Sequence, residues 1–175
     1  MTPMGERAMG NLDEVLDNLG VFRAAARELV QFCPSGFRRI PISQGPDFYL
    51  SLQALDGGQV AYAHTHPDSE EWTVVLDGKG EAMIHEAIPL EAGSVVGRAA
   101  AHPHGFRAGP DPFLMLSIQI PRPAEGGTTW DEAGTTSEPI HCVAGGRCRR
   151  CARCGGHSAE LTHDRFECEN CGNVF

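Results

Sequence analysis

The pattern of apolar and polar positions changes near residue 36 of the chain. Before that point, apolar residues recur every three or four positions, as in an amphipathic helix; these are Leu12, Val15, Leu16 and Leu19. The spacing predicts a helix from Asn11 to Phe32. A run of poor helix formers, Cys33-Pro34-Ser35-Gly36, ends it.

From Phe37 onward, short runs of β-branched and aromatic residues alternate with turn signals rich in Gly, Pro and Asp. Strands are predicted over residues 37–43, 47–55, 58–66, 71–77, 80–86, 94–98, 104–108 and 112–120. Many short strands at regular spacing are typical of a sandwich or a barrel, and not of an α/β fold. The sequence therefore predicts a mainly β fold that follows an N-terminal helix.

The rest of the chain lacks this periodicity. Its first part is rich in Pro, Gly, Thr and Ser, which predicts a linker that lies over the barrel through Trp130. The segment after the linker is rich in cysteine. The expected division is a helical segment at 1–36, a β-barrel at 37–121, a linker at 122–147 and a cysteine module at 148–175.

The chain has a formal net charge of −9, and the whole acidic excess lies before residue 141, since the tail is slightly basic. An acidic body argues against general binding to nucleic acid. Four arginines of the tail are interpreted as a solvated basic turn: Arg147, Arg149, Arg150 and Arg153. No stretch approaches the ~18 apolar residues of a membrane span, and the N-terminal residues lack an apolar secretory core. We therefore expect a cytoplasmic protein without a membrane partner.

The stretch HTHPDSEE, from His64 to Glu71, carries the candidate chemistry. On the strand predicted there, His64 and His66 point to the same face. If that face lines the barrel, a metal ion satisfies both imidazoles, whose burial without partners costs ~1–3 kcal/mol each. A carboxylate from Glu70 or Glu71 then offsets the charge of the ion. These two side chains point to opposite faces, and alternation alone does not choose between them.

The spacing of the stretch does choose. Gly58, His64, His66, Glu71 and Gly78 follow the pattern Gly-x5-His-x-His-x4-Glu-x6-Gly, which resembles the first signature of the cupin superfamily. The resemblance covers residues 40–120 and selects Glu71 as the third ligand. It implies a double-stranded β-helix, or jelly roll, in which two histidines and one glutamate bind a divalent metal.

A second cupin signature is retained in part. Counted from Gly93, the family has a metal-binding histidine eleven residues on, and His104 stands there. The resemblance therefore implies His104 as a fourth ligand. The family's proline, glycine and asparagine are replaced by Ala99, Ala101 and Ala108, so the loop before His104 departs from the pattern.

Three further side chains are candidates for acid–base or orienting roles. Tyr62 precedes His64 by two residues and shares its face by alternation, and His102 precedes His104 by two residues. His85 lies on the strand predicted over 80–86 and is either a pocket base or an outward-facing residue.

If Glu71 points inward, the other face of its strand exposes Trp72, Val74 and Leu76. Such a patch is usually covered. Either the N-terminal helix or a second subunit lies over it. Cupins commonly pair through the outside of the barrel, so the resemblance implies a homodimer.

The tail contains two matching halves, Cys151-x2-Cys154-Gly and Cys168-x2-Cys171-Gly. In a reducing compartment, clustered cysteines indicate a metal before a disulfide, and four thiolates in this order form one tetrahedral site. The module resembles a zinc ribbon or a rubredoxin-like finger, with zinc, or else iron, as its ion. Cys148 and His157 are alternative ligands, and redox-active thiols without metal are the alternative function.

The two predicted sites differ in kind. Four thiolates close the coordination of a structural ion, whereas three histidines and a glutamate leave positions open, as a catalytic centre requires. The resemblance implies an enzyme acting on a small molecule, foremost an Fe(II)-dependent dioxygenase. The alternatives are isomerase, lyase or decarboxylase chemistry with Mn, Ni or Zn, and a non-catalytic metal-containing binding or sensor protein.

Overall fold

The computed structural model describes residues 22–131, 139–141 and 146–175. Of the helix predicted from Asn11 to Phe32, the first part lies outside these residues, and the described part is helical over 22–29. Its end before Cys33 agrees with the predicted stop. Within the described residues, no helix has the length and apolar character needed to cross a bilayer.

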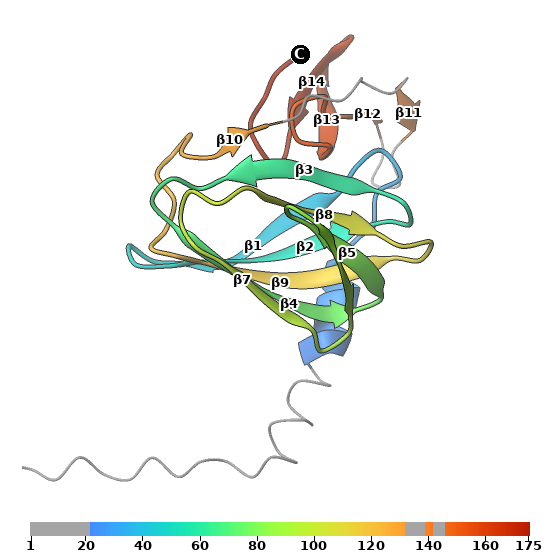
Figure 1. Ribbon diagram of the computed structural model, residues 1–175. Helices are drawn as coiled ribbons and strands as arrows, with labels where there is room; N and C mark the ends of the chain where they lie inside the picture. Colours follow the sequence, from blue (N-terminus) through green and yellow to red (C-terminus); the bar gives the residue numbers. More distant parts are fainter. Residues whose placement is uncertain (1–21, 132–138, 142–145) are drawn as a thin grey trace, which may run out of the picture.

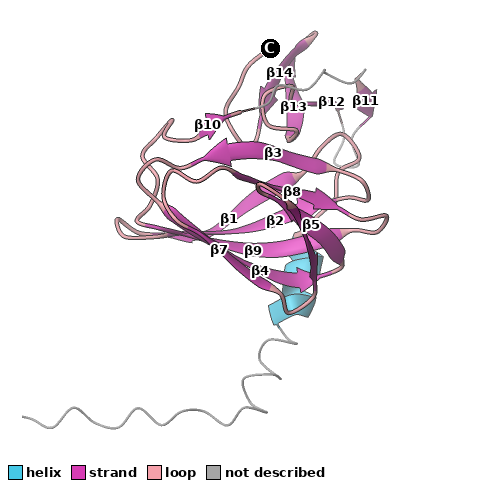
Figure 2. Ribbon diagram, viewed as in Figure 1, coloured by secondary structure: helices cyan, strands magenta, loops and turns pink. Residues whose placement is uncertain are grey.

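Two five-stranded antiparallel sheets form the body of the molecule (Figures 1 and 2). The first sheet consists, in spatial order, of β1 (Arg38–Gln44), β2 (Tyr49–Leu55), β9 (Phe113–Ile120), β4 (Glu70–Asp77) and β7 (Val95–Arg98). The second consists of β10 (Thr129–Trp130), β3 (Val60–Thr65), β8 (His104–Ala108), β5 (Lys79–Met83) and β6 (Ala87–Glu91). The mainly β jelly-roll fold predicted from the sequence is confirmed.

Strand β6 is not among the predicted strands, because Pro89 and Gly93 indicate a break. A proline lacks the backbone N–H and is tolerated only where no ladder bond is needed, as on an edge strand. β6 is such a strand, since it ends its sheet and pairs with β5 alone. The strand predicted over 80–86 is correspondingly too long, and β5 ends at Met83.

The space between the sheets has an apolar end and a polar end. On β9 the inward positions run from Phe113 and Met115 to Ser117 and Gln119, all of them buried. The inward positions of β2 and β4 also change from apolar to polar toward the same end of the barrel. The strand register sets their polar residues beside those of β9. The barrel is therefore closed by hydrophobic packing at one end and prepared for polar chemistry at the other.

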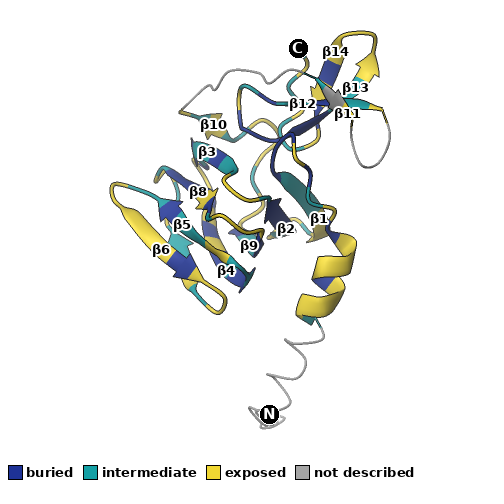
Figure 3. Ribbon diagram, turned by 90° about the vertical axis from the view of Figure 1, so that its right-hand side faces the viewer, coloured by how far each residue is buried: buried dark blue, intermediate teal, exposed yellow. Residues whose placement is uncertain are grey.

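The outer face of the first sheet is covered in part by the N-terminal helix. Leu52, Leu76 and Leu114 form a buried cluster there with Ala26 and Val30. Figure 3 shows the helix against this side of the barrel. Trp72, by contrast, remains 45 % exposed. The described part of the helix thus covers the end of the predicted apolar face near Leu76, while Trp72 at the other end stays partly exposed.

The tail forms a third sheet of four short strands: β11 (Ile140–His141), β12 (Arg147–Arg150), β13 (His157–Thr162) and β14 (Arg165–Cys168). β13 and β14 form an antiparallel hairpin between the two cysteine pairs. The tail lies over β3 and β10, on the side opposite the helix (Figure 1). Backbone contacts join them, including Tyr62 N–H to the Cys154 carbonyl at 3.2 Å. The segment predicted as a linker contributes β10 and β11.

Candidate metal centre

The four predicted ligands meet at the polar end of the barrel. His64, His66, Glu71 and His104 are all buried, and one ligand atom from each lies within 4.8 Å of the others. His64 of β3 pairs directly with His104 of β8, His66 follows the end of β3, and Glu71 lies on β4. Glu70 is exposed, as the spacing predicted. Strands from both sheets therefore supply one site.

Each imidazole is held through the nitrogen that faces away from the site. The three Nδ1 contacts are His64 to the Tyr62 carbonyl at 2.8 Å, His104 to the His102 carbonyl at 3.1 Å and His66 to the Thr128 hydroxyl at 3.1 Å. Such a contact fixes the tautomer and the ring orientation of a metal-binding histidine. All three rings consequently present Nε2 to the interior.

The two oxygens of Glu71 have different surroundings. Oε1 accepts hydrogen bonds from Gln53 at 3.3 Å, Thr73 at 3.4 Å and Ser117 at 2.8 Å. Oε2 lies 3.0 Å from His66 Nε2 and 3.3 Å from His104 Nε2. The first oxygen orients the carboxylate, and the second faces the histidines.

The charges of the site fit a divalent cation. Burial, followed by the charge of His104, lowers the pKa of His64 well below its usual value, so this ring is neutral and offers a lone pair. Burial also opposes ionisation of Glu71, but hydrogen bonds from His104 and His66 outweigh it and hold its pKa well below the usual value. Burial acts to lower the pKa of His104 as well, yet the bond to Glu71 raises it. A metal cation can replace the proton in the hydrogen bond between His104 and Glu71.

The prediction that Tyr62 faces the cavity is wrong. The pairing of β3 with β8 shifts register between Ala61 and His64, which marks a β-bulge. Ala61 and His64 therefore both point inward, and Tyr62 points away. Its hydroxyl accepts a hydrogen bond from Arg150 of the tail.

His102 and His85 also lie outside the ligand cluster. The His102 side chain is exposed and contacts the Ala100 carbonyl, although its own carbonyl orients His104. His85 is exposed in the bend after β5, because that strand ends earlier than predicted. Neither side chain is placed for acid–base work at the site.

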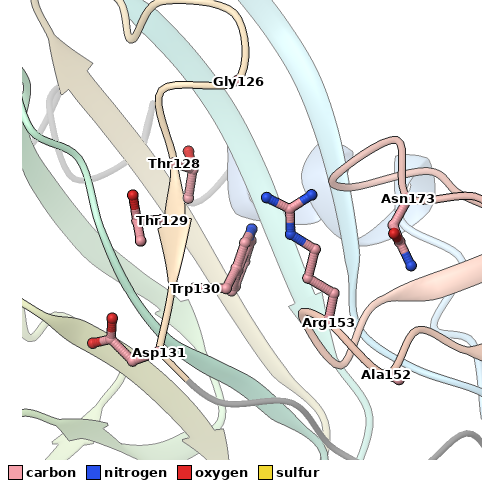
Figure 4. A pocket seen from close by; sticks show the side chains of 8 residues that line it. All are labelled: Gly126, Thr128, Thr129, Trp130, Asp131, Ala152, Arg153 and Asn173. Carbon is pink, nitrogen blue, oxygen red and sulfur yellow. The ribbon is translucent and has the colours of Figure 1, made fainter.

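The Trp130 ring covers the site. This agrees with the prediction that the segment carrying Trp130 lies over the barrel. It pairs with His64 across β10 and β3, and the two ring centroids lie 4.5 Å apart. Behind it, a cavity of about 10 Å³ next to His64 is bounded by Arg39 and Gln53 among others. On its outer side is a second cavity of about 480 Å³, into which Arg153 of the tail projects (Figure 4). Trp130 thus separates the two spaces.

The comparisons with known proteins agree with this geometry. Residues 51–119 match the Cupin domain family. The barrel has the cupin fold. No curated protein matches the sequence.

Solved structures resemble the cupin barrel over most of their own length. An uncharacterized conserved protein with a double-stranded β-helix domain from Klebsiella pneumoniae is 22% identical over 60% of this chain and 92% of that one, with a TM-score of 0.55. The protein TT1209 from Thermus thermophilus is 29% identical over 55% and 94%, with a TM-score of 0.53. An RmlC-like cupin protein from Desulfovibrio desulfuricans is 28% identical over 53% and 89%, with a TM-score of 0.50. These matches support the cupin superfamily for the barrel.

Several residues around the cupin site were not singled out from the sequence. Gln53, Ser117 and Gln119 are buried polar residues at inward positions of largely apolar strands. The sequence did contain a signal for the residues on β9. In FLMLSIQI, only two alternate positions are polar, whereas a strand face exposed to solvent would carry polar residues along its whole length. The Gln119 amide lies 2.6 Å from His66 Nε2 and 2.8 Å from Glu71 Oε2, at the edge of the site.

Beside the cupin barrel, the tail brings together the four predicted cysteines, Cys151, Cys154, Cys168 and Cys171, with their sulfurs within 4.8 Å of one another. Hydrogen bonds from the neighbouring thiols, first that of Cys154, lower the pKa of Cys151, and the bond to Cys151 in turn raises the pKa of Cys154. Four thiols this close cannot all ionise without a cation between them. The group therefore has the composition and geometry of a candidate metal site.

Cys148 and His157, the alternative ligands, do not belong to this group. Instead they lie with Cys33, the cysteine far from the others in sequence. Cys142 lies outside the described residues.

Proposed function

We propose that the protein is a metal-dependent cupin enzyme that oxidises a small molecule with O₂, using Fe(II) in the barrel. The convergence of three oriented imidazole nitrogens and one carboxylate oxygen carries this proposal. Histidine and carboxylate together suit non-haem Fe(II) with open positions. When bound, the ion supplies Lewis-acid and redox chemistry at the positions that these four ligands leave open.

The surroundings of the site leave little free volume beside it. The inner cavity of about 10 Å³ holds about one water-sized molecule. A larger substrate fits beside His64 once the Trp130 ring moves away from it. Because β10 is two residues long, few backbone bonds oppose that movement. The outer cavity of about 480 Å³ is then continuous with the site.

Arg39 favours a substrate that carries an anionic group. Its side chain lines the inner cavity, and its Nε donates a hydrogen bond to Ser51 at 3.2 Å. Among the described residues, its Nη2 atom is buried without a hydrogen-bond partner. A buried guanidinium nitrogen of this kind is satisfied by a carboxylate or a similar anion. We assign Arg39 the role of orienting such a group toward the metal.

The position of Trp130 also favours a second candidate. A ring that covers the metal site in the resting protein suits a metal-containing binding or sensor protein that opens only for its ligand. Non-redox chemistry with Mn, Ni or Zn would use the same ligands. The identity of the bound metal distinguishes it from oxidation with Fe(II).

Metal analysis of protein purified without added metal, followed by O₂-uptake assays against a panel of small carboxylates, tests the proposal. We expect iron in the barrel and O₂ uptake that depends on one of the carboxylates and is lost in R39A. A redox-silent metal with turnover identifies the non-redox reaction. Tight binding of a carboxylate without turnover identifies the binding protein.

We further propose that the Cys151, Cys154, Cys168 and Cys171 site holds a structural zinc, or else iron, as in a zinc ribbon. Four thiolates are typical of such a site, and a segment this short needs an ion to stay folded. The reducing cytoplasm, where we place the protein, keeps these thiols available for metal. We also propose that the protein forms a homodimer through the exposed part of the first sheet.

A further inference from the structure

A third cluster of potential metal ligands lies where the tail meets the segment after the helix. It consists of Cys33, Cys148 and His157, whose ligand atoms lie within 4.8 Å of one another. The exposed fractions of these residues are 4 %, 0 % and 3 %. They come from three separate segments: the loop after the helix, β12 and the first residue of β13.

The side chains face one another in this cluster. His157 Nδ1 lies 3.0 Å from Cys33 Sγ, across 124 positions of sequence. It also lies 2.7 Å from the hydroxyl of Ser35. Burial lowers the pKa of His157, so the ring is neutral and has a lone pair available.

We infer that Cys33, Cys148 and His157 bind a zinc ion that fastens the N-terminal segment of the cupin barrel to the tail. Two sulfurs and one imidazole nitrogen are a donor set that zinc favours, and thiolate selects against the hard ions Mg²⁺ and Ca²⁺. The site is separate from the four-cysteine group, with which it shares no ligand.

The backbone around the cluster is already arranged for such a link. Phe37 and Gly156 form a parallel β-bridge, and His157 N–H donates to the Phe37 carbonyl at 2.9 Å. A side chain at Gly36 would meet the Gly155 carbonyl at 2.4 Å, so the two segments are in direct contact there. An ion at Cys33 closes a loop of more than a hundred residues, where a cross-link has the largest effect on the unfolded chain.

Cobalt titration of the metal-free full-length protein tests the inference, because sulfur-to-cobalt absorption reports only thiolate-bound ions. We expect two equivalents of thiolate-bound cobalt per chain, one in the four-cysteine group and one at Cys33, Cys148 and His157. The barrel site has nitrogen and oxygen ligands and contributes no such band. A single equivalent in the wild-type protein would overturn the inference, whatever the variants do.

Variants then assign the second equivalent. C33S should remove it and lower the sulfur-to-cobalt absorption by about a third, because the site supplies two thiolates beside the four of the cysteine group. S35A, which removes a hydroxyl partner of His157 Nδ1, should leave both equivalents in place. Unchanged cobalt binding in C33S, or a Cys33–Cys148 disulfide in protein from reducing cells, contradicts a zinc site.

Discussion

Glu71 uses its two oxygens for different purposes, and one substitution separates them. In E71Q the amide oxygen can still accept the bonds from Ser117 and Thr73, but an NH₂ group then faces His66 and His104. A nitrogen that carries two hydrogens has no lone pair for a cation. We expect the barrel metal to bind more weakly by at least the ~10–100-fold that loss of an outer partner costs.

The matched control is E70Q, since Glu70 is the exposed neighbour of Glu71 on the same strand. Its metal content, measured by plasma mass spectrometry after dialysis, should equal that of the wild-type protein. Equal metal loss in both variants would show that Glu71 is not a ligand.

Ala101 shows the energetic cost of a departure from the family pattern. It stands where the second signature has glycine, and its φ is 61°, in the left-handed region. That conformation costs a non-glycine residue ~1–2 kcal/mol, while glycine loses ~0.4–1 kcal/mol through a freer unfolded chain. We expect A101G to raise the free energy of unfolding by ~0.5–1 kcal/mol in urea titration. The control A99G changes a position without positive φ and should lower the free energy of unfolding. If both substitutions changed that free energy in the same direction, Ala101 would not be strained.

At the scale of elements, the short strand β10 pairs with β3 beside the candidate metal site. Its Trp130 ring lies on His64, and a contact between rings of this kind is worth ~0.5–1.5 kcal/mol. We expect W130A to quicken chelator-driven release of the barrel metal by up to about tenfold. W72A removes the other tryptophan, from the outer face, and should leave the rate unchanged. Unaltered release in W130A would mean that the ring does not close the site.

The same elements show what the sequence can and cannot predict. Glu71 could be preferred to Glu70 because the spacing of a whole motif carries information that the alternation of one strand lacks, and the structure buries Glu71 beside the histidines. Tyr62 was placed wrongly because a bulge shifts that alternation by one residue, and nothing in the local sequence marks it. Strand β6 was missed because a proline prevents pairing on one side only, and the sequence does not say which strand lies at an edge.

Longer-range associations were hidden for a different reason. Cys33 stands alone in the sequence, and its partners belong to the tail, more than a hundred residues away. The contact depends on how the tail lies against the barrel, which no periodicity encodes. The position of Trp130 was an exception. A single tryptophan in a polar segment indicated that the segment packs against the barrel.

At the scale of the whole molecule, the first sheet has an uncovered apolar face. Trp72, Val95 and Ile120 are 45 %, 60 % and 42 % exposed, and the strand register places them near one another on β4, β7 and β9. Within the described residues, the helix at 22–29 packs against Leu52, Leu76 and Leu114, and the three residues of the uncovered face remain exposed.

We therefore expect a dimer at micromolar concentration in light scattering, and a shift to monomer in V95D, because an unpaired charge is costly to bury. L161D is the control, since Leu161 is a similarly exposed apolar residue of the tail, 51 % exposed. A monomeric wild-type protein would exclude the dimer.

The proposed function requires a single cation held between the two sheets of the barrel. Anomalous diffraction from crystals of protein purified without added metal tests this directly. We expect a peak within bonding distance of Nε2 of His64, His66 and His104 and of one Glu71 oxygen. Crystals that show no peak there, even after soaking in Fe(II), Mn, Ni and Zn, would contradict it.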